Sequence, residues 1–169
     1  MSFQELIDFL DGNKVKYVNI QHSKAYSDEE IWASDQIKGG VIAHSCIIKI
    51  NEIYAMVVVP GKYNADDDLM KQITCERDAR IVADNEIREI YPELDPAFIP
   101  PFGHLLNINL YVAKTLLDHN EFYFCALSPR DIIKISCEDY KRIAKPLIGK
   151  YTINEYYMKF VNASEYFLC

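Results

Sequence analysis

The residues best suited to chemistry lie in the stretch GGVIAHSCIIKI, residues 39–50, where His44, Ser45 and Cys46 interrupt an apolar run. Strand alternation would put His44 and Cys46 on one face and Ser45 on the other. The histidine has two interpretations: it is hydrogen-bonded within a sheet, or it lies in a cleft and contacts a substrate oxygen. With a reference pKa of about 6.5, a neutral imidazole can donate one hydrogen bond or act as a base.

A second unusual stretch is DPAFIPPFGH, residues 95–104. Its three prolines fix the backbone, and Gly103 permits a conformation that other residues resist. A rigid loop of this kind suits the wall of a pocket. It equally suits a long structural connection that closes over a sheet.

The common signatures of enzymes and metal sites are absent from the sequence. It contains no P-loop, no G-x-G-x-x-G, no H-E-x-x-H and no G-x-S-x-G. The five cysteines form no C-x-x-C pair, which predicts reduced thiols. The histidines are too scattered to argue for a metal site, so we expect neither metal nor cofactor; they are His22, His44, His104 and His119.

The formal charge of −7 provides no basic field for a nucleic-acid backbone. We therefore expect no DNA binding and no tight non-specific nucleic-acid binding, although a small site could still accept one end of a nucleic acid. The N-terminus lacks a basic start followed by a long apolar core, and the longest apolar run, IYAMVVV, is far shorter than a membrane span. These features predict a cytoplasmic protein without a membrane partner.

Capping boxes, β-rich runs and breakers define the expected elements. The first helix is expected to begin at a capping box of Ser2 and Glu5 and to end before Gly12. Two more helices are expected over 27–37 and around 66–73. A fourth is expected from a cap at Asp84 to about Tyr91, and a fifth from Ser136 for about ten residues. Strands are expected over 15–20, 41–50, 53–59, 79–83, 107–112, 121–127 and 131–135, with a two-residue hairpin connection at Asn51 and Glu52 and a rigid loop over 92–104.

This order predicts an α+β (mixed α/β) fold with a central mixed, largely antiparallel sheet flanked by helices. Residues 1–149 are expected to form one domain. Residues 150–169 are rich in tyrosine and phenylalanine and are expected to form a helical extension, packed on the sheet or on a second subunit. The sequence leaves open whether the protein is a monomer or a homodimer.

The order of several short motifs resembles the YbaK/EbsC family over about residues 15–145: HSKAYSDEE, GGVIAHSCIIKI, YAMVVVPGKYNADDDLM, RIVADNEIREIYPEL, AFIPPFG and EFYFCALSPRDIIKIS. These proteins are aminoacyl-tRNA deacylases that share a domain with the editing insertion of bacterial prolyl-tRNA synthetase. The resemblance implies a mixed sheet flanked by helices, and a pocket that hydrolyses the ester of a mischarged tRNA without a metal.

The sequence departs from the family pattern at four places. The characteristic lysine falls on His44, and the G-x-x-x-P loop falls on Ala97 to Pro101, which keeps the proline and loses the glycine. The small, glycine-containing turn after the strand EFYFCA is Leu127 to Pro129, and Ala113 stands where an acidic residue is usual. The fold is therefore better supported than the mechanism.

The resemblance implies catalytic roles for His44 and for Ala97, whose backbone N–H would help to hold the substrate carbonyl. It implies a substrate-binding set of His22, Tyr26, Ser45, Ile99, Pro100, Pro101, Gly103 and Ser128. The expected function is a trans-editing deacylase whose partner is the aminoacyl-tRNA acceptor end, met directly or delivered by a synthetase. Two alternatives stay open: an inactive relative that binds an aminoacyl-tRNA end, a nucleotide or a protein, and a purely structural partner domain.

Overall fold

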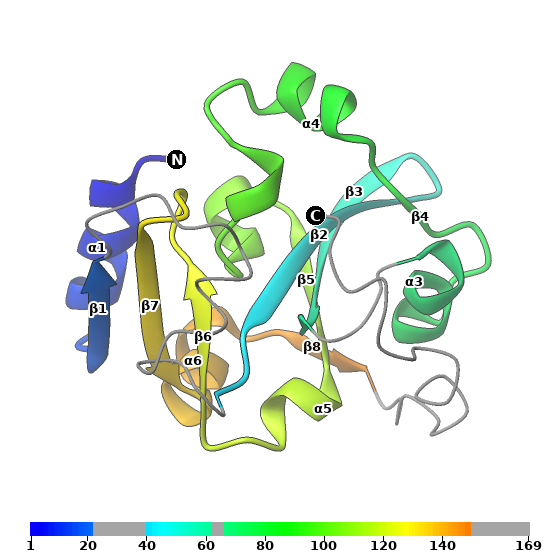
Figure 1. The fold of residues 1–169 in the computed structure, drawn as a ribbon. Helices are drawn as coiled ribbons and strands as arrows, with labels where there is room; N and C mark the ends of the chain where they lie inside the picture. The colour runs from blue at the N-terminus through cyan, green and yellow to red at the C-terminus, as the bar shows by residue number, and fades with distance from the viewer. Residues whose placement is uncertain (22–39, 62–65, 150–169) are drawn as a thin grey trace, which may run out of the picture.

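The computed structural model describes residues 1–21, 40–61 and 66–149, and these residues build two β-sheets with helices around them (Figure 1). One sheet has three antiparallel strands in the order β1 (Tyr17–Gln21), β7 (Asp131–Ser136) and β6 (Glu121–Cys125). The other has five strands in the order β4 (Arg80–Ile81), β2 (Ala43–Ile50), β3 (Ile53–Pro60), β5 (Asn109–Ala113) and β8 (Leu147–Gly149).

The five-stranded sheet is mixed. Strands β4, β2 and β3 pair antiparallel, whereas β3, β5 and β8 pair parallel. The two sheets are linked by an isolated parallel bridge between Ile42 and Tyr123, where the Tyr123 N–H donates to the Val41 carbonyl at 2.8 Å. Strands β2 and β6 therefore run in the same direction where the sheets meet. The α+β class is confirmed, with the strands divided between two sheets.

The hairpin of β2 and β3 has the predicted two-residue connection. Its register runs from Ala43 opposite Pro60 to Ile50 opposite Ile53. Asn51 and Glu52 have φ angles of 46° and 70°, the left-handed pair that a type I′ turn requires. This tight turn fixes which face of the sheet each side chain of β2 occupies.

Most helices begin at the predicted signals. Ser2 and Glu5 form a complete capping box at α1 (Phe3–Gly12), and the Ser136 hydroxyl caps α6 (Cys137–Ala144) by accepting from the Asp139 N–H. The helix predicted around residues 66–73 is α3 (Asp67–Thr74), capped by Asp66. The prediction that Asp84 caps α4 (Asp84–Ile90) is wrong, because Ala83 is the N-cap and makes no side-chain hydrogen bond.

The rigid loop after α4 contains two short 3₁₀ helices, η1 (Pro96–Phe98) and η2 (Gly103–Leu106). Two short elements were not predicted: α5 (Lys114–Leu117) and β8. The predicted helix over 27–37 and the extension over 150–169 lie outside the described residues. Among the helices that the structure describes, no candidate for a membrane-spanning segment is found. In the described part of the chain, Cys75 is an exposed free thiol and Cys137 is a buried one.

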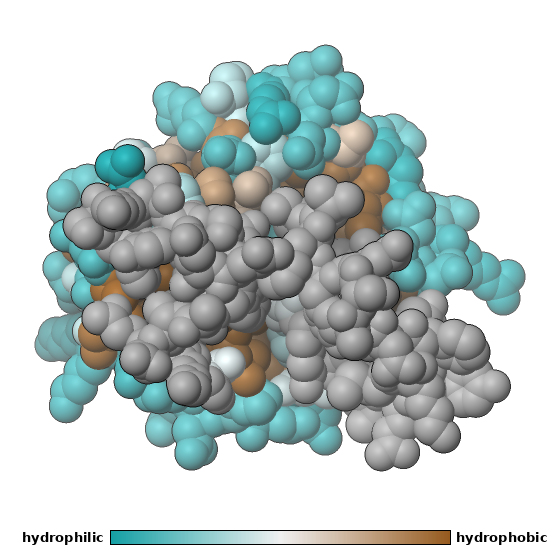
Figure 2. All heavy atoms as spheres, viewed as in Figure 1, coloured by the Kyte–Doolittle hydropathy of each residue, from teal (hydrophilic) through white to brown (hydrophobic). Residues whose placement is uncertain are grey.

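The strand β2 separates distinct hydrophobic clusters. Ala43 and Ile47 belong to the main core, which α1, α6 and the 92–104 loop also enter. Cys46 belongs to a second cluster that includes Leu69 and Met70 of α3. The predicted alternation of β2 is thus confirmed for these residues. In the view of Figure 2, hydrophilic side chains form most of the outline of the face, and hydrophobic side chains are visible in separate patches within it.

Candidate functional site

The two polar side chains at the start of β2 lie on opposite faces of the sheet. His44 is half-buried and shares the face of Ile42 and Cys46, away from the main core. Ser45 is only 6% exposed and lies between two residues of the main core. One strand therefore presents an imidazole on one side and a hydroxyl on the other.

The Ser45 hydroxyl has no hydrogen-bond partner among the described residues. Leaving a buried hydroxyl without a partner costs about 1–3 kcal/mol. Such a group is rare in a native core and calls for an explanation, of which a functional role is one. A substrate-binding role for Ser45 stays a prediction.

His44 stands next to the place where the two sheets separate. Two residues earlier, Ile42 bridges to Tyr123 of β6, and both strands then continue in the same direction. Further along, β2 pairs with β4 through Ile48 and Lys49, while β6 pairs with β7. His44 therefore lies near the junction of the two sheets.

The Ala97 N–H is already engaged in a local hydrogen bond. It donates to Asp95 Oδ1 at 3.1 Å, and the Phe98 N–H donates to the Asp95 carbonyl at 3.0 Å. Both bonds form the cap of η1. To hold a substrate carbonyl, the Ala97 N–H would have to break its hydrogen bond to the Asp95 carboxylate. The Asp-Pro pair that starts this turn is a recognisable sequence signal.

The loop over 95–104 contacts the turn that follows β6, far along the sequence. The Leu127 N–H donates to the Phe98 carbonyl at 3.0 Å. Leu127 has a φ angle of 65°, a left-handed conformation that favours glycine, and the family resemblance places a glycine-containing turn here. The structure thus brings together two segments that the resemblance assigns to one pocket.

Ser128 is satisfied within this turn. Its hydroxyl donates to Asp131 Oδ2 at 2.7 Å and accepts from the Arg130 and Asp131 N–H groups at 3.1 and 3.2 Å. This is a local serine turn. Its hydroxyl is therefore committed to shaping the turn beside the Phe98 carbonyl.

The other predicted loop residues are buried. Ile99, Pro100 and Pro101 pack inward, and the Pro101 carbonyl accepts from the Tyr140 hydroxyl at 2.7 Å. Gly103 is needed for close packing, because a Cβ there would lie 3.0 Å from the Ile108 carbonyl oxygen. These residues shape the loop from within.

The ring of the neighbouring His104 packs at a tilt of 53° against that of Phe9, with ring centroids 4.6 Å apart. Desolvation lowers the pKa of His104, so its neutral form is favoured. Of the predicted substrate-binding residues, His22 and Tyr26 lie outside the described residues. Within the described part, no group of three or more His, Cys, Asp and Glu side chains could hold a metal ion.

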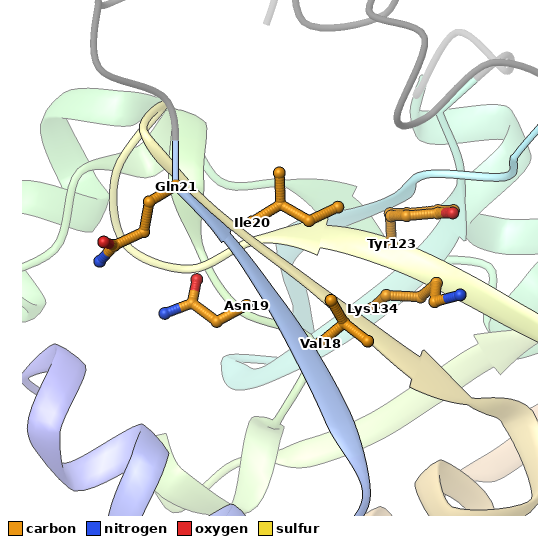
Figure 3. Close-up of a pocket in the computed structure, with 6 residues that line it drawn as sticks. All are labelled: Val18, Asn19, Ile20, Gln21, Tyr123 and Lys134. Atoms are coloured by element: carbon orange, nitrogen blue, oxygen red, sulfur yellow. The ribbon is translucent and has the colours of Figure 1, made fainter.

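An open groove lies on the three-stranded sheet (Figure 3). It has a volume of about 460 Å³ and is lined by Val18, Asn19, Ile20, Gln21, Tyr123 and Lys134. The Lys134 ammonium lies 3.0 Å from a Glu121 carboxylate oxygen and 5.9 Å from the centre of the Tyr123 ring. None of the site residues predicted from sequence lines this groove, and no motif pointed to it.

Comparison with solved structures supports the fold. A hypothetical protein of known crystal structure is 18% identical, with a TM-score of 0.73, covering 85% of this chain and 96% of that one. A protein described as a candidate trans-editing enzyme for prolyl-tRNA synthetase is 17% identical, with a TM-score of 0.69, covering 88% of this chain and 96% of that one. A candidate signal transduction protein from Marinobacter aquaeolei is 12% identical, with a TM-score of 0.66, covering 89% of this chain and 31% of that one.

No protein of curated function matches the sequence at a significant level. The family model for the aminoacyl-tRNA editing domain matches residues 22–143, well over half of the chain. The match includes His44, the 95–104 loop and the turn after β6. The resemblance seen in the sequence is thereby confirmed, and the chain belongs to the aminoacyl-tRNA editing domain family.

Proposed function

We propose that this protein is a trans-acting deacylase that hydrolyses the ester joining a wrong amino acid to the 3′ end of a tRNA. The observation that carries the proposal is the editing-domain match, which includes β2, the 95–104 loop and the turn after β6. The hydrogen bond between Leu127 and Phe98 supports it, because it joins two of the expected pocket segments. The proposed catalytic residue is His44, in the position of the family's lysine.

The reaction requires a water molecule to attack the carbonyl carbon of the ester. The carbonyl oxygen becomes an oxyanion, the bond to the ribose oxygen breaks, and that oxygen takes up a proton. The products are a free amino acid and an uncharged tRNA. Positioning of the water and donors for the oxyanion are the main contributions an enzyme can make here.

A neutral His44 could perform chemistry that a protonated lysine cannot. Its basic nitrogen could accept the proton of the attacking water and return it to the leaving ribose oxygen. A histidine in this role is expected to lose activity as the pH falls and the imidazole becomes protonated. A lysine in its place would act as a fixed positive charge near the oxyanion.

The charge of the protein limits how it meets tRNA. A net charge of −7 gives no long-range attraction to a polyanion. We propose that the protein, as a monomer or homodimer in the cytoplasm, contacts only the acceptor end, met directly or presented by a synthetase. The whole body of the tRNA would then add little to binding.

A catalytically inactive binding module is the second candidate. The Ala97 N–H is held by Asp95, so one expected donor for the oxyanion is engaged. The usual lysine is also replaced by histidine. An inactive relative would keep the fold and the acceptor-end site while losing hydrolysis.

A panel of mischarged tRNAs separates the two candidates. Each charged tRNA would be incubated with the purified protein, and both amino-acid release and binding would be measured. The role of His44 is tested in the same assay with the His44→Ala variant. Its matched control is His119→Ala, which removes an exposed histidine between α5 and β6. Release above the uncatalysed rate from at least one tRNA supports the deacylase, and binding without release supports the inactive module. If the protein neither binds nor deacylates any tRNA of the panel, both candidate functions are contradicted.

A further inference from the structure

Tyr140 of α6 is completely buried, and its hydroxyl reaches a loop far away in the sequence. The side chain has no exposed surface, and its hydroxyl donates to the Pro101 carbonyl at 2.7 Å. Desolvation raises the pKa of Tyr140 well above its ordinary value, so the hydroxyl remains a donor. The hydroxyl therefore stays protonated at neutral pH.

The ring of Tyr140 is held by two other rings. It meets Phe122 edge-on with centroids 4.9 Å apart, and Phe102 with centroids 5.5 Å apart. These contacts define where the hydroxyl points. Phenylalanine at position 140 would keep both ring contacts and lose only the hydrogen bond to the loop.

The loop has few ways to anchor itself at this end. Pro100 and Pro101 have no N–H groups, so they cannot donate hydrogen bonds to neighbouring strands. The loop is instead held through its carbonyl oxygens: Phe98 by the Leu127 N–H and Pro101 by the Tyr140 hydroxyl. The two anchors lie on either side of Ile99 and Pro100.

We propose that Tyr140 is a positioning residue, which fixes the substrate-binding loop over 97–101 from beneath through the Pro101 carbonyl. The expected effect on catalysis rests on the proposed function. The hydroxyl does not touch substrate. It sets the position of the backbone that is expected to face the ester carbonyl, and small displacements of such groups reduce rate strongly.

The test compares Tyr140→Phe with Tyr17→Phe, which removes an exposed hydroxyl that donates to Asp11 at 3.1 Å. On a tRNA that the wild type deacylates, Tyr140→Phe is expected to lower kcat by about tenfold or more and to change KM by less than about threefold, because the loop acts in the transition state. Tyr17→Phe should match the wild type. A Tyr140→Phe protein with unchanged kcat at a temperature where it is fully folded would overturn the proposal.

A second measurement does not depend on catalysis. The Leu127 amide, which donates to the Phe98 carbonyl, should exchange with solvent deuterium several-fold faster in Tyr140→Phe, relative to the Val57 amide in β3. An unchanged ratio would overturn the anchoring role. If the wild type releases no amino acid from any tRNA, the proposed function fails, and this exchange ratio alone decides whether Tyr140 holds the loop.

Discussion

Leu127 has a backbone conformation that is costly for its residue type. Its φ angle of 65° is left-handed, and its side chain packs against the main core. Left-handed backbone costs a residue with a Cβ about 1–2 kcal/mol relative to glycine. Strain of this kind persists where the surrounding structure enforces it, and it is frequent at functional sites. Here it lies beside the Phe98 carbonyl.

Leu127→Gly is expected to lower the free energy of unfolding by less than the removal of a half-buried leucine usually does. Relief of the left-handed strain should offset much of the lost packing, so it should cost at least about 1 kcal/mol less than a leucine-to-glycine change at ordinary φ. Leu105→Gly is the control, because Leu105 is also half-buried against the main core and has no positive φ. Urea unfolding measures both. Equal costs would contradict the strain at Leu127.

For single residues, helix caps were predictable from the sequence, whereas hydrogen-bond partners from distant segments were not. The capping box of Ser2 and Glu5 and the cap at Ser136 depend on residues three positions apart, which the sequence displays directly. The bond from Tyr140 to Pro101 and the hydroxyl of Ser45 without a described partner depend on how distant segments pack. No local pattern encodes such contacts.

The hairpin of β2 and β3 is the element that positions His44 and Ser45. Its two-residue connection was predicted from the apolar runs on either side, since loop length and hydrophobic alternation together fix the register. By contrast, α5 and β8 were missed. Each has only three or four residues, so neither develops a periodic pattern, and β8 is formed by parallel pairing with β5.

Glu52→Gly should stabilise this hairpin. Glu52 has a φ angle of 70°, and glycine is the preferred residue at that position of a type I′ turn. The gain should exceed the loss of the ion pair with Lys49, which is worth about 0–1 kcal/mol because the Glu52 carboxylate in it is largely exposed. We expect a net increase of about 0.5–1 kcal/mol in the free energy of unfolding, measured by urea denaturation.

The Glu52→Ala variant is the matched control for this change. It removes the same ion pair and keeps the Cβ, so it should be no more stable than the wild type. Were Glu52→Ala to stabilise the protein as much as Glu52→Gly, the turn conformation would not be the cause.

At the scale of the whole molecule, one aromatic cluster joins the candidate site to the core. Phe102 is fully buried, and its ring lies 5.6 Å from those of Phe9 and Phe124 and 5.5 Å from that of Tyr140. These partners come from α1, β6 and α6. The sequence predicted that the 92–104 loop is rigid, but the ring partners of Phe102 could be known only from the fold.

Phe102→Ala should therefore destabilise the entire described domain. Removing a fully buried phenylalanine typically costs about 3–5 kcal/mol. Thermal unfolding should show a single transition at a much lower midpoint, and Phe98→Ala, a half-buried loop residue, should cost clearly less. A small effect at Phe102 would show that the loop is not part of the cooperative core.

His44 is the residue proposed to carry out the chemistry of a deacylase. Its role is measured by single-turnover release of amino acid from a mischarged tRNA, compared between the wild type and His44→Ala. We expect the variant to be slower by about 100-fold or more, within the range for loss of a general base, while His119→Ala releases amino acid at the wild-type rate. Equal rates for the wild type and a folded His44→Ala protein would contradict the role of His44.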